Sequence, residues 1–287
     1  MKVLFGIIVT VLSLCASAQQ PVKVLHQFAP SATFAIALNR FAEPLSAELK
    51  RPVVFEGYSG AGGAVMMNAY QNLGDNNTFL VAGTNPYTVI PLLQKVDYRT
   101  DDLEPLALFA LSPMCYAARN DAKETEYKKF IAANKGKFYG SLGISTIEAL
   151  LLENINRTES LGQTGINYKS YAEITTSLMR GDIQWTIVPK NLCGGNDIRS
   201  PQSGLGLVEI KGVPANLDPS YWFGIFGKKS VDRKILDSFT SVFVDTWWKN
   251  KEAYSKTVHY PEKPLLNEEF KKYIEVDRKK WEAVIKK

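Results

Sequence analysis

Residues 22–49 read VKVLHQFAPSATFAIALNRFAEPLSAEL, and this stretch decides the fold. Its β-branched and apolar start predicts a strand over 22–28, and residues 29–32 supply a turn. Apolar residues then recur at helical spacing, namely Phe34, Leu38, Phe41, Leu45 and Leu49. The stretch is therefore one βα unit. Pro44 inside the helix predicts a kink or a break, because proline lacks an amide donor and crowds the preceding turn.

The same alternation continues along the chain. Further strands are predicted at 53–56, 78–82, 106–111, 114–119, 137–141, 183–188 and 205–210, with an aromatic strand from Tyr221. Helices are predicted from Glu126 and from Thr146, and two long amphipathic helices over 231–257 and 267–286. This order is typical of an α/β protein with a mainly parallel sheet covered by helices. The length favours either two lobes or one large fold with a substantial core.

The N-terminus predicts export. Lys2 precedes an apolar run over 3–14 that is too short to span a bilayer, and Ala16-Ser17-Ala18 is an Ala-x-Ala cleavage site. We therefore expect a cleaved signal peptide over residues 1–18 and a periplasmic mature protein. A lipoprotein signal at Cys15 and a retained anchor are the rival interpretations, and bulky Leu14 disfavours the first.

Charge and cysteine content exclude some classes. The net charge of +5 is mild, and the basic doublets sit among Glu and Asp, so solvated helix faces explain them and no nucleic-acid partner is expected. Cys115 and Cys193 remain after Cys15 is removed, without metal-ligand spacing. A disulfide and two buried free thiols both stay open.

The sequence contains few residues in patterns that are suited to catalysis. The only histidines are His26 and His259, and no metal-binding His pair or Gly-x-Ser-x-Gly turn occurs. The glycine-rich run at 60–63 lacks the Lys-Ser/Thr of a phosphate loop, so a tight turn before a helix explains it. We expect no enzyme activity, no metal and no cofactor.

Two strand-to-helix turns are better site candidates. They lie at 30–33 and 140–146, and each opens a predicted helix. A helix start presents unpaired amide donors and a partial positive charge, so it can hold a carboxylate without arginine. The alternative is that the hydroxyl residues at these turns merely cap helices, as such residues commonly do.

Several motifs resemble one family in order and spacing. Residues 27–35 stand where that family has Pro-Phe-x-Pro-Gly-Gly-x-x-Asp, and 56–63 are similar to its Glu-Asn-Arg-Pro-Gly-Ala-Gly-Gly. Further similarity lies at 98–107, 137–143, 168–169, 222–224 and 280–281. By these residues the mature chain resembles the substrate-binding proteins of tripartite tricarboxylate transporters, also called Bug-type receptors.

The resemblance implies a two-lobed periplasmic-binding-protein fold, with mixed sheets covered by helices and a ligand cleft between the lobes. Lobe 1 would comprise 19–110 plus 226–287, and lobe 2 would comprise 111–225. The implied function is capture of a small organic acid by lobe closure and delivery to the membrane subunits of a transporter, with a monomer as the default. Hinge strands are expected near 108–115 and 221–227. A receptor that feeds a sensor kinase, and an exported enzyme, are the alternative functions.

The resemblance also implies ligand contacts. In lobe 1 these are Phe28, Ser31, Ala32, Thr33, Phe34, Gly83, Thr84 and Asn85. In lobe 2 they are Ser141, Gly143, Ile144, Ser145 and Thr146, with Tyr168, Pro189 and Lys190 as outer candidates. A large residue in place of Ser145 or Thr146 should weaken binding without unfolding the protein.

The sequence departs from the family pattern at informative positions. Ser31 and Ala32 replace two glycines, and Ala35 replaces an aspartate, which favours a simple carboxylate over an amino acid as the ligand. Glu148 replaces a histidine. If it faced the cleft it would repel an anion or accept a proton or a cation; we expect it instead to face water in the first turn of its helix and to complement the helix dipole.

Overall fold

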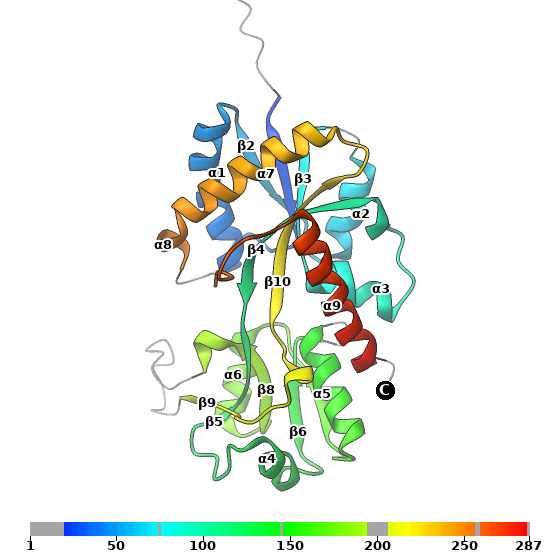
Figure 1. Cartoon of the computed structure of the whole chain (residues 1–287). Helices are drawn as coiled ribbons and strands as arrows, with labels where there is room; N and C mark the ends of the chain where they lie inside the picture. The colour runs from blue at the N-terminus through cyan, green and yellow to red at the C-terminus, as the bar shows by residue number, and fades with distance from the viewer. Residues whose placement is uncertain (1–19, 74–75, 144–145, 194–205, 256–258, 286–287) are drawn as a thin grey trace, which may run out of the picture.

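Two β-sheets arranged end to end form the body of the protein (Figure 1). The computed structural model describes residues 20–73, 76–143, 146–193, 206–255 and 259–285. The six-stranded sheet has the order β11-β4-β10-β3-β1-β2, and the five-stranded sheet has the order β7-β6-β8-β5-β9. Within the described ranges, no helix combines the length and apolar character needed to cross a membrane.

The first sheet mixes parallel and antiparallel strands. Strands β1 (Val22–His26), β2 (Val53–Gly57) and β3 (Thr78–Gly83) are parallel. Strand β10 (Tyr221–Lys228) runs antiparallel to β3 and to β4 (Leu103–Ser112), and β11 (Leu265–Leu266) pairs antiparallel with β4. The expected mainly parallel sheet is therefore a mixed sheet, as the family resemblance implied.

Helices cover both faces of this sheet. Helices α1 (Thr33–Leu49) and α7 (Arg233–Lys249) bury Phe41, Phe243 and Trp247 in one core. On the other face α2 (Ala64–Asn72) and α9 (Asn267–Ile285) bury Tyr70 and Phe270. Short helical turns complete this half: η1 (Ala61–Gly63), η2 (Asn85–Val89), α3 (Ile90–Leu93), η3 (Thr100–Asp102) and α8 (Lys251–Tyr254).

The second sheet is also mixed. Strand β5 (Met114–Arg119) runs antiparallel to β8 (Trp185–Pro189) and β9 (Leu207–Glu209), whereas β6 (Phe138–Ser141) is parallel to β7 (Thr164–Asn167) and β8. Its helices are α4 (Tyr127–Ala133), α5 (Ile147–Thr158) and α6 (Tyr171–Arg180), with the turns η4 (Lys190–Leu192) and η5 (Ala215–Leu217). Cys115 on β5 and Cys193 after η4 form a disulfide, which settles the alternative left open by the sequence.

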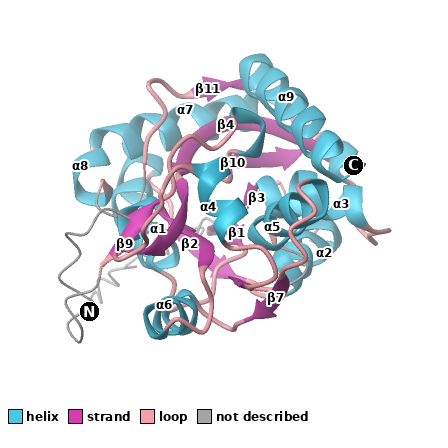
Figure 2. Ribbon diagram, turned by 90° about the horizontal axis from the view of Figure 1, so that it is seen from below, coloured by secondary structure: helices cyan, strands magenta, loops and turns pink. Residues whose placement is uncertain are grey.

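Three segments connect the two halves. The chain passes from β4 to β5 at Pro113, and it returns through η5 to β10. Helix α9 runs alongside both halves, and Figure 2 shows its C-terminal end beside α5. The Asn154 side chain of α5 donates a hydrogen bond of 2.7 Å to the Val284 carbonyl of α9. The strands that cross near Pro113 and Tyr221 lie within the two segments expected to act as hinges.

Two predicted helices differ from the structure. Helix α1 continues through Pro44 without a break. The buried side chains of Leu38, Phe41 and Leu45 hold it on the sheet, so packing outweighs the backbone hydrogen bond that proline removes. The helix expected over 231–257 ends at Lys249 because Asn250 caps it, and α8 follows; residues 256–258 lie outside the described ranges.

Candidate ligand-binding site

The turn between β1 and α1 leaves a helix start open. Ala32 is the N-cap of α1, no side chain caps the helix, and its first turn contains no acidic residue. The cap position is therefore held by an alanine and not by Ser31, and the side chain of Thr33 lies outside what the structure describes. Because the first amides of a helix have no partner within it, those at the start of α1 can receive an anion.

Three phenylalanine rings stand beside this turn. The ring centroid of Phe28 lies 4.8 Å from that of Phe34 and 5.2 Å from that of Phe223, and the Phe34 and Phe223 centroids are 4.7 Å apart. Phe28 and Phe34 are partly buried, and both pack against the core beneath α1. The rings form an apolar wall between the α1 start and strand β10.

The segment after β3 is buried and strongly constrained. Gly83 admits no side chain, because a Cβ there would lie 2.7 Å from the Phe223 ring. The Thr84 hydroxyl accepts a hydrogen bond of 3.0 Å from the Trp222 amide. Asn85 donates from Nδ2 to the Gly62 carbonyl at 3.0 Å, while its buried Oδ1 has no hydrogen-bond partner among the described residues. Asn85 is thus the residue of this segment whose side chain has an unused hydrogen-bond acceptor.

The glycine-rich run packs on the same segment. A Cβ on Gly62 would lie 2.5 Å from Asn85 Nδ2, and one on Gly63 would lie 2.8 Å from both Gln27 Oε1 and Pro86 Cγ. The run therefore serves close packing, as the tight-turn interpretation expects. Gln27, whose Oε1 is also buried without a partner in the described chain, was not predicted as a site residue.

The second turn joins β6 to α5. The Ser141 hydroxyl donates to Asn167 Oδ1 at 3.0 Å, and Gly143 adopts a φ of 116°, which favours glycine. Thr146 is the N-cap of α5: its hydroxyl oxygen accepts from the Ala149 amide at 3.3 Å and donates to the Gly143 carbonyl at 2.8 Å. The capping interpretation is therefore right for Thr146. Ile144 and Ser145 lie outside the described residues.

The outer candidates differ in their surroundings. Tyr168 lies against the second turn: its amide donates to the Ser141 carbonyl at 2.8 Å, and its ring covers Gly140. Lys190 is exposed and forms an ion pair with Glu209 of β9, and Pro189 pairs in register with Met114. Tyr168 is thus beside the second turn, whereas Lys190 already has a partner.

Glu148 corrects the sequence-based expectation. Its side chain does not face water, because only 1% of the residue is exposed. Its Oε1 accepts a hydrogen bond from the Tyr171 hydroxyl of α6, and its Oε2 accepts one of 2.5 Å from the Tyr221 hydroxyl of β10. The sequence contained no signal for this cluster, because its members come from three separate elements.

Both tyrosines remain protonated donors. Burial, and then the negative charge of Glu148, raise the pKa of Tyr171 well above its usual value, and the same two causes raise the pKa of Tyr221. The hydroxyls therefore donate to Glu148 across the whole physiological pH range.

The first turn and the start of α5 both have contacts with strand β10. Tyr221 and Phe223 are two residues apart on this strand, so their side chains share a face at a spacing of about 7 Å. Phe223 contacts the first turn through Phe28, and Tyr221 contacts the second helix start through Glu148. In addition, Val89 after β3 shares a buried cluster with Ile147, the first residue of α5.

His26 stabilises the first turn through a hydrogen bond to its backbone. It is 2% exposed at the end of β1, and its Nδ1 accepts a hydrogen bond of 3.2 Å from the Phe28 amide. Burial lowers the pKa of His26 to about 4, so the ring is neutral and its Nδ1 stays available as an acceptor. Among the described residues, no group of three or more His, Cys, Asp or Glu side chains forms a metal site.

The fold is that of a two-lobed solute-binding protein. A TctC solute-binding protein from Polaromonas matches with a TM-score of 0.71 at 18% identity, covering 93% of this chain and 98% of that one. MatC from Rhodopseudomonas palustris, with bound malate, matches with a TM-score of 0.68 at 16% identity over 92% and 98%. Rpa4515 of R. palustris, with adipate, matches with a TM-score of 0.71 at 16% identity over 93% and 96%. At these identities the likeness shows the fold alone.

The family follows from the sequence. The model of the tripartite tricarboxylate transporter family receptor, TctC, matches residues 38–193, more than half of the chain, and the protein belongs to this family. A UPF0065 protein of Bordetella pertussis is 29% identical over 160 residues, which are 54% of this chain and 50% of that protein. The chain thus spans about half the length of this curated relative. The resemblance read from the motifs and the expected α/β fold class are confirmed.

Proposed function

We propose that this protein is a periplasmic receptor that captures a small organic acid between two lobes and delivers it to the membrane subunits of a tripartite tricarboxylate-type transporter. The observation that carries the proposal is that Phe28 of the first turn and Glu148 at the start of α5 contact neighbouring positions on the same face of β10, namely Phe223 and Tyr221. A ligand at this face would meet the amides at the α1 start, the phenylalanine wall and the start of α5.

The recognition we propose depends on backbone donors. The uncapped start of α1 offers amides and a partial positive charge to a carboxylate, and the apolar wall beside it suits a carbon chain. Family membership supports this assignment, as do the relatives with malate and with adipate. No step of this function changes the ligand chemically.

Lobe closure is the mechanism we propose. The lobes would be 19–110 plus 226–287 and 111–225, and the strands crossing near Pro113 and Tyr221 would bend. A ligand that contacts both turns favours the closed form by as much as it binds that form more tightly. The closed form is then what the membrane subunits would recognise.

A thermal-shift screen tests the function. The purified protein should be heated with mono-, di- and tricarboxylates, including hexanoate, adipate, malate and citrate. A true ligand at one hundred times its dissociation constant stabilises the native state by about 2.7 kcal/mol. If no member of the panel raises the melting temperature, carboxylate capture is wrong. Recovery of the bound acid unchanged after prolonged incubation separates a receptor from an enzyme.

A substitution at the second turn tests the site. Thr146→Tyr should weaken binding of the best ligand at least tenfold, a loss of about 1.4 kcal/mol, because the ring intrudes on the turn. The loss of the cap costs about 1 kcal/mol of stability and leaves the protein folded. Thr158→Tyr, at the other end of α5, is the matched control and should bind normally. Calorimetry showing equal affinity for both variants would refute the placement.

A further inference from the structure

Glu148 is a buried acid held by two hydroxyl groups. Its two oxygens accept hydrogen bonds from Tyr171 and Tyr221, which come from α6 and β10. Only 1% of the residue is exposed, and across the described parts of the chain no lysine, arginine or histidine forms an ion pair with it. Within the described chain, this acid beside the second turn is therefore paired with hydroxyl groups and with no positive side chain.

The hydrogen bonds suit the ionised form. A carboxylate has acceptor oxygens only, and here both of them receive a hydroxyl donor. Glu148 also lies in the first turn of α5, where the partial charge of the helix start favours an anion. The carboxylate of Glu148 thus already balances part of the positive charge at the start of α5.

The charge lies close to the expected ligand position. Glu148 follows the N-cap Thr146 by two residues, so their Cα atoms are within about 7 Å of each other. Two unit charges about 8 Å apart at an effective dielectric constant of about 20 repel enough to weaken binding roughly thirtyfold. The start of α1 has no acid in its first turn, so a ligand carboxylate meets no such repulsion there.

From this asymmetry we propose that Glu148 is a specificity-determining residue, which selects acids with one carboxylate at the α1 start and an end without negative charge at the α5 start. The inference rests on the proposed carboxylate-binding function and deepens it. It predicts that a monocarboxylate binds more tightly than the dicarboxylate of the same chain length.

Calorimetry with matched acids tests the proposal. The pairs are hexanoate with adipate and butyrate with succinate, titrated into the wild-type protein and into Glu148→Gln. The amide keeps the shape of the side chain and an acceptor for one tyrosine while removing the charge. The wild type should favour each monocarboxylate at least tenfold, and the substitution should tighten the dicarboxylates by roughly ten- to thirtyfold at an effective dielectric constant of about 20. The affinity for the monocarboxylates should change by less than about threefold, because they place no charge near residue 148.

Glu153→Gln is the matched control. Glu153 lies on the same helix and also accepts a hydrogen bond from a tyrosine, 2.6 Å from the Tyr139 hydroxyl, but its side chain is exposed. Because water screens its charge, the ratio of the two affinities should stay at the wild-type value.

The outcomes separate the two proposals. Tighter binding of adipate than of hexanoate by the wild type overturns the role of Glu148, and this holds even if the variant does not fold. An unchanged ratio in folded Glu148→Gln overturns it as well, while carboxylate binding as such stands. Absence of binding by every acid to both proteins overturns the receptor function together with the inference.

Discussion

His26 shows how one buried side chain can connect folding to pH at the site. The neutral ring accepts a hydrogen bond from the Phe28 amide. This hydrogen bond fixes the turn that leads into α1. A protonated ring would carry a proton on Nδ1 and could not accept this bond. Gly57 closes the other side, since a Cβ there would lie 2.9 Å from the His26 ring. The site therefore has little room to adapt to a charged imidazole.

The protein should lose stability on acidification through this residue. The folded-state pKa of His26 is about 4 and lies below the unfolded value of about 6.5, so the unfolded chain binds more protons between these limits. The contribution of neutral His26 to the free energy of unfolding is full above pH 6.5 and is lost as the pH falls toward 4. The loss amounts to about 2 kcal/mol at pH 5. Urea unfolding at pH 7 and at pH 5 measures it.

His26→Asn provides the comparison, because the Oδ1 of asparagine can accept the hydrogen bond from the Phe28 amide in place of the ring nitrogen. The variant should lose about 2 kcal/mol less than the wild type between the two pH values. Equal losses in both proteins would show that His26 does not titrate as its burial implies.

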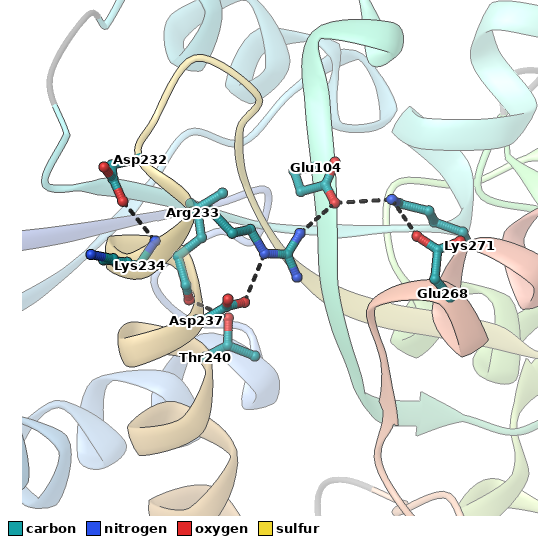
Figure 3. Close-up of polar contacts among 9 residues, drawn as sticks. Glu104, Asp232, Arg233, Lys234, Asp237, Thr240, Glu268 and Lys271 are labelled. Atoms are coloured by element: carbon teal, nitrogen blue, oxygen red, sulfur yellow. Dashed lines mark hydrogen bonds and ion pairs between the residues drawn. The ribbon is translucent and has the colours of Figure 1, made fainter.

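Among the elements, β4, α7 and α9 are joined through one carboxylate (Figure 3). Glu104 at the start of β4 is 8% exposed, and its Oε1 accepts from Arg233 of α7 and from Lys271 of α9, each at 3.0 Å. Hydrogen bonds to Glu268 and to Glu104 raise the pKa of Lys271, so the ammonium group stays charged. The two helices thereby cover the same end of the strand.

Glu104→Gln should destabilise the protein by about 1–2 kcal/mol, because a buried acceptor loses its charge while both cations remain. The free energy of unfolding in urea gives the measurement. Glu269→Gln is the control: Glu269 pairs with Lys263 at 2.9 Å on the exposed surface, where an ion pair contributes about 0–1 kcal/mol. A loss no larger than that of the control would contradict a joining role for Glu104.

Sequence patterns predicted the elements well where one rule dominated. Strand β5 matches its predicted bounds, and Thr146 begins α5 as expected, because β-branched runs and hydroxyl caps act locally. The antiparallel return of β10 and the pairing of Cys115 with Cys193 depend on contacts between distant segments, which local patterns do not encode. Glu148 was misplaced for the same reason: its neighbours Tyr171 and Tyr221 are far from it in sequence.

At the scale of the whole molecule, α9 belongs to both halves. Asp277 on this helix accepts hydrogen bonds from Trp222 of β10 at 2.7 Å and from Trp281 at 3.0 Å. Phe270 packs in the core of the first sheet, whereas Trp281 and Val284 pack in the core of the second. The helix crosses from one sheet to the other beside the strands that we propose as hinges. We therefore expect it to oppose separation of the two sheets.

Trp281→Ala should therefore weaken the second half, although the proposed lobe boundaries assign residue 281 to the first. Trp281 is 0% exposed, and removing a buried tryptophan costs about 3–5 kcal/mol. Hydrogen exchange should show the loss in strands β5, β6 and β8 as well as in α9. Val276→Ala on the same helix, where 70% of the residue is exposed, should change stability by less than about 0.5 kcal/mol. Protection that falls only in the first sheet would mean that the end of α9 merely rests on the second core, and the two halves would then be free to move without it.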